Sequence, residues 1–354
     1  MYSVSSVITN FNGGDCIINC IRALYRQEVP LEAIIVVDSG STDGSPDRIR
    51  ATFPDVQLVE LSEDRGLPKA RNIGLQLCKT DLILLLDDDV YVAEDCLRHM
   101  LEVYSQEKPA VICPRIILFP ELEVVQTDGA EAHFLGTMAL RHGYRPVKDV
   151  PAETTTVGGC IGACYFVHRE RVLKAGGFDE AYFFYFEDLE FSIRLRAFGH
   201  KFICVPAAIV YHDRGSGTPG LSFRGQGKYP SRKAFLTLRN RLMTILIHYR
   251  VRTLAVLMPA LAFYEFASLV LVLFRNWGAE WARAWLWQIF NIRAILKRRK
   301  WVQKMRKLND RDLLVGGSPP LVPGLLNSRI AIAAFTTLSK LIDAYWYIAQ
   351  NWLG

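Results

Sequence analysis

The chain has 354 residues, half of them apolar, and a formal net charge of +6. This length and composition allow a full hydrophobic core in one large or two smaller domains, and they exclude a disordered protein. The first nine residues lack the basic start and apolar core of a signal peptide. The eight cysteines lie mostly in apolar segments and show no zinc-type spacing, as expected for buried thiols in a reducing compartment.

The first hundred residues alternate short β-branched runs with helical stretches. Strands are expected at 4–9, 34–38, 56–60 and 82–86, and helices at 17–24, 47–53, 68–78 and from about residue 94. This alternation predicts a mostly parallel sheet with helices on both faces. Ligands of such sheets bind beyond the carboxyl ends of the strands. Two of the strands run directly into acids, Asp38 and Asp87–Asp89, so a carboxylate-lined site is predicted at that edge.

The second hundred residues are less regular. Strands are expected at 112–119, 164–168 and 202–205, and a helix at 188–198. A stretch rich in Gly, Ser and Pro at 214–231 predicts a long mobile loop, and the composition changes after it. We therefore expect a catalytic domain at 1–230, divided near residue 105 into a nucleotide-binding half and an acceptor half, and a helical region at 231–354.

Two common nucleotide-binding loops are absent from the sequence. The segment after the first strand, Asn10–Asp15, lacks the spaced glycines of a dinucleotide-binding turn, and no P-loop occurs. A bound nucleotide must then be held by side chains and a metal ion.

Three consecutive acids, Asp87, Asp88 and Asp89, follow a buried apolar strand. Alternation places Asp87 and Asp89 on one side, where their repulsion calls for a cation. Mg²⁺ or Mn²⁺, which bind carboxylates and substrate phosphates together, meet that need. The alternative is that the acids cap the following helix or occupy a solvated turn.

A second acidic cluster, Glu187–Asp188–Leu189–Glu190, opens the helix expected at 188–198, directly after five aromatic residues at 182–186. A carboxylate beside an apolar wall can take a proton from a hydroxyl in a partly dehydrated pocket. The alternative is structural: Asp188 caps the helix, and Glu187 and Glu190 pair with Arg194.

Five motifs in this order resemble the family 2 glycosyltransferases, and within that family bacterial rhamnosyltransferases and similar enzymes of cell-surface polysaccharide synthesis. The resemblance covers about the first 215 residues and rests on Val36–Ser45, Arg65–Gly66, Ala70–Leu75, Leu86–Asp89, and Gly176–Glu180 with Glu187–Asp188. It implies a GT-A fold, a nucleotide-diphospho-sugar donor and inversion at the anomeric carbon. Ser39 departs from the family, which more usually has Asn there.

The resemblance also implies roles for individual residues. Donor binding falls to Thr9, Asp38, Arg71, Asp87 and Asp88; Mg²⁺ or Mn²⁺ binding to Asp89, Asp87 and His212; the general base to Asp188; and the acceptor side to Gly158, Gly159, Cys160 and Glu187. Two of these assignments have structural alternatives. His212 could be an ordinary strand-end histidine, and the glycines could form a tight entry to a strand.

The implied activity is transfer of a sugar to a hydroxyl of a lipid-linked glycan. A non-catalytic nucleotide-sugar-binding scaffold is the alternative, although the presence of every acid in both clusters argues against it. A transporter would need more membrane spans than the one or two candidates in this sequence. The donor sugar, the linkage and the oligomeric state are not predicted.

The C-terminal region is basic and apolar. Residues 236–308 contain 14 Lys or Arg and only two acids, so the rest of the chain is net acidic. Tryptophans and long aliphatic runs separate these charges, which favours an anionic membrane surface over nucleic acid. We expect peripheral or monotopic attachment at the cytoplasmic face of the inner membrane.

One segment of this region, 254–274, is apolar and just long enough to cross a bilayer, but Pro259 and Glu265 argue against a simple span. Apolar stripes recur at helical spacing over 281–296 and 330–352. We expect these helices to lie in the membrane surface. There are two alternatives: the apolar segment spans the membrane, or the stripes pack on the catalytic domain.

Overall fold

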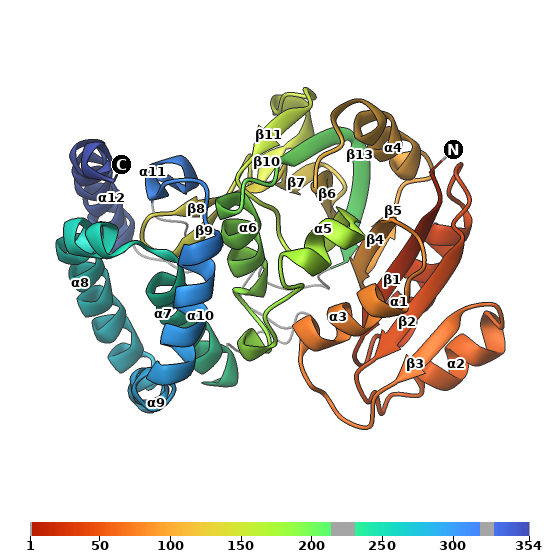
Figure 1. Ribbon diagram of the computed structural model, residues 1–354, viewed down its shortest axis with the longest axis horizontal. Helices are drawn as coiled ribbons and strands as arrows, with labels where there is room; N and C mark the ends of the chain where they lie inside the picture. The colour runs from red at the N-terminus through yellow and green to blue at the C-terminus, as the bar shows by residue number, and fades with distance from the viewer. Residues whose placement is uncertain (1, 214–230, 319–328, 354) are drawn as a thin grey trace. The chain divides into compact units, whose positions relative to one another are not determined.

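A computed structural model describes residues 2–213, 231–318 and 329–353 (Figure 1). The chain forms two compact units, one from 1–130, 140–191 and 200–215 and the other from 131–139, 192–199 and 216–354. The boundary expected near residue 230 and most of the loop expected at 214–231 lie outside the described residues. Two short early segments belong to the second unit, an arrangement that the sequence did not predict.

A mixed sheet of eleven described strands forms the centre of the first unit. Its members are β1 (Val4–Asn10), β2 (Ala33–Asp38), β3 (Gln57–Glu60), β4 (Leu82–Asp87), β5 (Val90–Val92), β6 (Val111–Phe119), β7 (Val124–Thr127), β10 (Arg145–Pro146), β11 (Thr155–Val157), β12 (Cys164–His168) and β13 (Phe202–Asp213). Strands β3, β2, β1 and β4 are parallel neighbours, as the alternating region predicted. The antiparallel strand β12 lies between β4 and β6.

Helices cover both faces of this sheet, which confirms the predicted α/β class. They are α1 (Gly14–Tyr25), α2 (Ser45–Thr52), α3 (Leu67–Leu77), α4 (Cys96–Glu107), α5 (Arg169–Lys174) and the first turns of α6 (Glu187–Ala197). Ile8 of β1 joins a core with residues of α1 and α4. Its neighbour Val7 points to the opposite face, toward Gly74 of α3, where an added Cβ would lie 2.2 Å from the valine.

Strand β13 is much longer than the expected strand at 202–205. Pro206 has no N–H to donate, so the sequence pattern predicts the end of the strand there, but the strand continues through a bulge between Val205 and Ile209. It then pairs with both β6 and β5. The extension carries His212 along the sheet to the level of β5.

The second unit combines a small sheet with a group of helices. The sheet contains β8 (Ala130–His133), β9 (Thr137–Leu140) and β14 (Leu314–Val315), and the helices are α7 (Ser231–His248), α8 (Val251–Phe274), α9 (Gly278–Phe290), α10 (Ile292–Met305), α11 (Asp310–Leu313) and α12 (Arg329–Ala349). Two hydrogen bonds connect the early segment 131–139 to this unit. Arg241 of α7 donates to the carbonyl of Leu135, and the hydroxyl of Tyr249, the residue after α7, donates to the carbonyl of Phe134. The stripe expected at 281–296 is divided between α9 and α10 at Asn291.

Helix α8 is the one helix among the described residues that is long and apolar enough to cross a membrane, by length and composition. Only 11% of the most apolar 18-residue stretch of this helix is buried. Glu265, which argued against a span, forms an ion pair with Arg241 of α7, so its charge is compensated within this unit. Large side chains stay exposed along α8, among them Met258, Phe266 and Phe274.

Candidate active site

The parallel strands bring three predicted site residues to one edge of the sheet. Thr9 of β1 lies in register with Asp87 of β4, and Asn10 lies in register with Asp38 of β2. The Thr9 hydroxyl is 3.4 Å from a carboxylate oxygen of Asp87. This edge is the carboxylate-lined one that the sequence predicted.

Asp38 closes the turn that follows β2. One of its carboxylate oxygens accepts from the backbone N–H groups of Gly40 and Ser41, at 3.1 and 2.9 Å, and the other accepts from the side chains of Asn10 and Ser41, at 2.5 and 2.6 Å. The side chain is 1% exposed. In this geometry Asp38 organises the turn after β2. The expected contact of Asp38 with a nucleotide base stays a prediction.

Asp88 faces the loop after β1. Its side chain is buried and accepts a hydrogen bond from the backbone N–H of Phe11 at 3.1 Å. A Cβ at Gly13 would lie 2.9 Å from the same carboxylate. Asp88 therefore holds the loop at 11–13 against the mouth of the site.

Arg71 of α3 is a fully buried cation that joins the two acidic clusters. Its guanidinium donates to Asp87 at 2.8 Å and to the carbonyl of Gly162 at 2.7 Å, and it lies 3.4 Å from Glu187. Burial alone would lower the pKa of Arg71, but Asp87 beside it raises that pKa above its usual range. Since the side chain is 1% exposed, the geometry favours an indirect role over the diphosphate contact that the family resemblance implied.

Asp188 begins α6 next to this cluster. One oxygen of its carboxylate accepts from the backbone N–H of Gly162 at 3.3 Å, and the other accepts from that of Leu189 at 2.7 Å. Burial raises the pKa of Asp188. Burial also raises the pKa of Glu187, and the negative charge of Asp188 raises it further. Glu187 is buried against Arg71, whereas Asp188 is half-buried, so Asp188 is the more accessible of the two carboxylates.

The aromatic segment before α6 is held in an unusual backbone conformation. Phe183, Tyr185 and Phe186 all have positive φ values, of 64°, 64° and 66°. The backbone of Phe183 packs so closely on Gly66 that an added Cβ there would lie 2.5 Å from the Phe183 carbonyl oxygen. Glycine is therefore required at position 66 to position the segment that leads into Asp188.

His212 and Asp89 meet at the end of β13. Nε2 of His212 lies 3.3 Å from a carboxylate oxygen of Asp89, and Nδ1 lies 2.8 Å from the side-chain oxygen of Gln126. The side-chain oxygen of Gln126 can accept a hydrogen bond from Nδ1, and Nε2 is directed toward Asp89. A divalent cation would satisfy both groups, and Gln126 would fix the ring as metal-site partners commonly do.

The chemistry of these side chains fits Mn²⁺ or Mg²⁺. Burial raises the pKa of the Asp87 carboxyl; Arg71 lowers it and the charge of Asp89 raises it further. Among the residues that the structure describes, no group of three or more His, Cys, Asp or Glu side chains is gathered closely enough to hold an ion. An ion bound by Asp89 and His212 would need oxygens of the substrate or water, as Mg²⁺ sites in phosphate-handling enzymes do.

The glycine-rich segment takes a structural part in the sheet. The carbonyl of Gly159 accepts from the backbone N–H of Ala130 at 2.8 Å, and the thiol of Cys160 is buried. The expected position of Cys160 on the acceptor side stays a prediction, and its buried thiol would not contact an acceptor in this conformation. Gly158 adjoins this bridge, and Gly162 instead connects Arg71 to Asp188.

Three residues of the site were missed from the sequence. Asn10 directly follows the first strand and could have been recognised as a strand-end polar group beside Asp38. Gly162 acts through its backbone, and Gln126 reaches His212 from a strand 86 positions earlier, so local sequence offered no signal for either.

A solved structure shows the fold class. The crystal structure of GalNAc-T7 with UDP, GalNAc and Mn²⁺ matches 72% of this chain and 49% of that chain, with a TM-score of 0.57 and 17% identity. At this identity the likeness shows the fold alone, and it confirms the predicted GT-A architecture followed by a helical region.

The sequence comparisons then give the family. Residues 5–171 match the model of Glycosyl transferase family 2, the family that the motifs resemble.

Several curated proteins are similar to this chain. The N-acetylglucosaminyl-diphospho-decaprenol L-rhamnosyltransferase of Mycobacterium tuberculosis is 27% identical over 209 residues, covering 52% of this chain and 68% of that protein. The pre-mycofactocin glycosyltransferase of the same organism is 29% identical over 193 residues, 54% of this chain and 40% of that protein. The succinoglycan biosynthesis protein ExoO of Rhizobium meliloti is 34% identical over 128 residues, 36% of this chain and 35% of that protein. These matches support glycosyl transfer as the chemical class and confirm the resemblance to rhamnosyltransferases.

Proposed function

We propose that this protein is an inverting glycosyltransferase. It would move a sugar from a nucleotide-diphospho-sugar to a hydroxyl of a lipid-linked glycan during cell-surface polysaccharide synthesis. The observation that carries the proposal is the placement of Asp188: a half-buried carboxylate with a raised pKa, linked through Gly162 and Arg71 to Asp87 at the carboxyl edge of the sheet. The name of the rhamnosyltransferase relative, which includes a diphospho-decaprenol, supports the lipid-linked acceptor.

The reaction would be a single displacement. Asp188 takes the proton of the acceptor hydroxyl while that oxygen forms its bond to the anomeric carbon and the bond from this carbon to the diphosphate breaks. Gly162 and Leu189 orient the two carboxylate oxygens of Asp188 through their N–H groups. A divalent cation bound at Asp89 and His212 would supply charge neutralisation for the departing diphosphate.

Stereochemistry tests the inverting assignment directly. The anomeric configuration of the first-formed product, followed by NMR from a donor of known configuration, is expected to be opposite to that of the donor. Retention of configuration would contradict a single displacement with Asp188 as base.

Donor binding is expected to require Mg²⁺ or Mn²⁺. The acids at the strand edge repel a diphosphate unless a cation lies between them, so a chelator should weaken binding of a nucleoside diphosphate by at least about tenfold. Calorimetric titrations of several nucleoside diphosphates, with metal and with chelator, measure the difference. His212→Ala should abolish most of the gain from metal.

A matched control is available on the surface. His99 of α4 lies 3.2 Å from Asp95, which directly precedes the helix, a pair similar to His212 and Asp89 but away from the candidate site. His99→Ala should leave the metal dependence unchanged. Equal affinity with and without chelator would rule out the metal assignment.

We also propose that the helical unit attaches the enzyme to the cytoplasmic face of the inner membrane, as a peripheral or monotopic protein. The exposed apolar side chains of α8 and the basic residues of α10 support this, because each Lys or Arg near an anionic surface contributes about 1 kcal/mol. Salt screens that attraction. High-salt and carbonate washes of membranes should therefore release most of the protein. Complete resistance to both washes would favour a span through α8 instead.

A further inference from the structure

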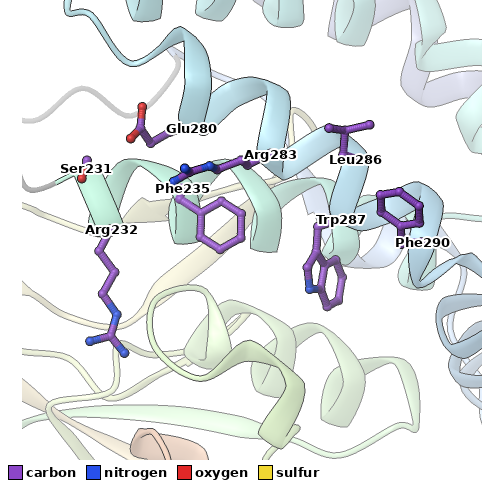
Figure 2. A pocket seen from close by; sticks show the side chains of 8 residues that line it. All are labelled: Ser231, Arg232, Phe235, Glu280, Arg283, Leu286, Trp287 and Phe290. Atoms are coloured by element: carbon purple, nitrogen blue, oxygen red, sulfur yellow. The ribbon is translucent and has the colours of Figure 1, made fainter.

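A groove opens between α7 and α9, within the second unit (Figure 2). Its volume is about 530 Å³, which is in the range of small-molecule sites. It is lined by Ser231, Arg232 and Phe235 of α7 and by Glu280, Arg283, Leu286, Trp287 and Phe290 of α9.

The lining changes character along the groove. Figure 2 shows Ser231, Arg232 and Glu280 toward one end, and Leu286, Trp287 and Phe290 toward the other. The α9 residues recur every three or four positions, so one face of this helix passes from charged to apolar. Arg283 brings a positively charged group to the polar end of the groove.

The walls of the groove are fixed from the buried side. The guanidinium of Arg239 lies over the rings of Trp287 and Phe235, with centroid distances of 4.8 and 5.6 Å. The buried amide of Gln288 donates to the Arg239 carbonyl at 2.7 Å, which ties α9 to α7. The two aromatic walls are thus set in place before any ligand arrives.

The apolar end continues onto an exposed surface. Leu286, Ile289 and Phe290 are 49%, 63% and 81% exposed, and α9 packs against the apolar helix α8. A ligand with an anionic end and a long apolar chain would fit this order, with its charge at Arg283 and its chain leaving along the surface that we assign to the membrane.

We propose that this groove binds the diphosphate and the first prenyl units of the lipid-linked acceptor, an inference that rests on the proposed function. A guanidinium group binds phosphate oxygens through two parallel hydrogen bonds, so Arg283 suits the phosphate end of such a ligand. Aromatic and aliphatic walls suit a prenyl chain and offer little to a free sugar. A nucleic acid finds no continuous basic track among these residues.

Farnesyl diphosphate is a suitable probe for the full-length protein held in detergent. Calorimetry with chelator present, which keeps the metal site from contributing, should show binding at least about tenfold tighter than that of inorganic diphosphate or farnesol. Arg283→Gln should weaken farnesyl diphosphate binding about tenfold, since it removes a charge-assisted hydrogen bond. Phe290→Ala should weaken farnesyl diphosphate while leaving inorganic diphosphate unchanged. All three side chains that are changed, including the control below, are exposed, so these variants should fold.

Arg293→Gln is the matched control, because it removes the same charge from an exposed position on α10 outside the groove. It should leave the affinity unchanged. Three results would each overturn the proposal. The first is an equal loss of affinity in Arg283→Gln and Arg293→Gln, and the second is equal affinity for farnesyl diphosphate and inorganic diphosphate. The third is that phosphatidylglycerol competes for the site as well as farnesyl diphosphate does. The proposed function is measured separately by sugar transfer. If Arg283→Gln transfers sugar as well as the wild type, only the proposed role of the groove is contradicted. If the wild type binds farnesyl diphosphate but transfers no sugar, the proposed function is contradicted.

Discussion

Asp188→Asn is expected to keep its affinity for the donor and to lose turnover by about 10² to 10⁴-fold, the range typical of a general base. The substitution keeps the shape of the side chain, and the amide oxygen can still accept a hydrogen bond from Gly162 or Leu189. The variant loses one of these two backbone hydrogen bonds and the ability to take a proton. Steady-state rates and donor titrations of the two proteins measure both quantities. A variant that retains more than about a tenth of the wild-type rate would make Asp188 a helix cap and Glu187 the next candidate.

The pH dependence of the wild type gives a second readout of the same carboxylate. The base must be deprotonated to act, so turnover falls as the pH drops through its pKa. Because burial raises the pKa of Asp188, this fall should occur at a higher pH than for an ordinary aspartate. The acid limb assigned to Asp188 should be missing from the residual activity of Asp188→Asn.

Arg71→Met is expected to destabilise the first unit by about 3–5 kcal/mol, the usual effect of removing one partner of a buried ion pair. Asp87 and Glu187 would lose their shared cation, and the Gly162 carbonyl would lose its donor. Chemical denaturation, followed by circular dichroism, measures the loss. The same substitution at Arg48, whose ion pair with Asp15 is exposed, is expected to leave stability nearly unchanged.

Equal stability of Arg71→Met and Arg48→Met would contradict the joining role assigned to Arg71. A stable Arg71→Met variant that has lost only donor affinity would instead restore the diphosphate contact implied by the family. The two roles are thus separable by measuring unfolding and donor binding on the same protein.

Local sequence was enough to predict one side of the site. The alternation of strands and helices placed Asp38 and Asp87 at one sheet edge, because parallel strands end together, and Thr9, which the family resemblance implied, lies at the same edge. The partners that arrive from elsewhere could not be predicted in this way. Gln126 meets His212 only because β13 continues past Pro206 and pairs with β6, beside which β7 lies.

The helical region shows a similar limit. Periodicity predicted its apolar stripes but not that Arg241 would neutralise Glu265 24 positions away, nor that residues 131–139 would fold with it. Side-chain pairs on different helices depend on how those helices pack, and the spacing within one helix does not specify that packing.

The measurement that tests the central claim most directly is a donor screen by mass spectrometry, with a lipid-linked acceptor and a divalent metal supplied. The wild type should release a nucleoside diphosphate from one donor and increase the mass of the acceptor by one sugar residue, while Asp188→Asn should do neither at a comparable rate. If the wild type binds a nucleotide-sugar in the same assay but modifies no acceptor and releases no diphosphate from any donor, the protein is a nucleotide-sugar-binding scaffold and the account of its catalysis is wrong.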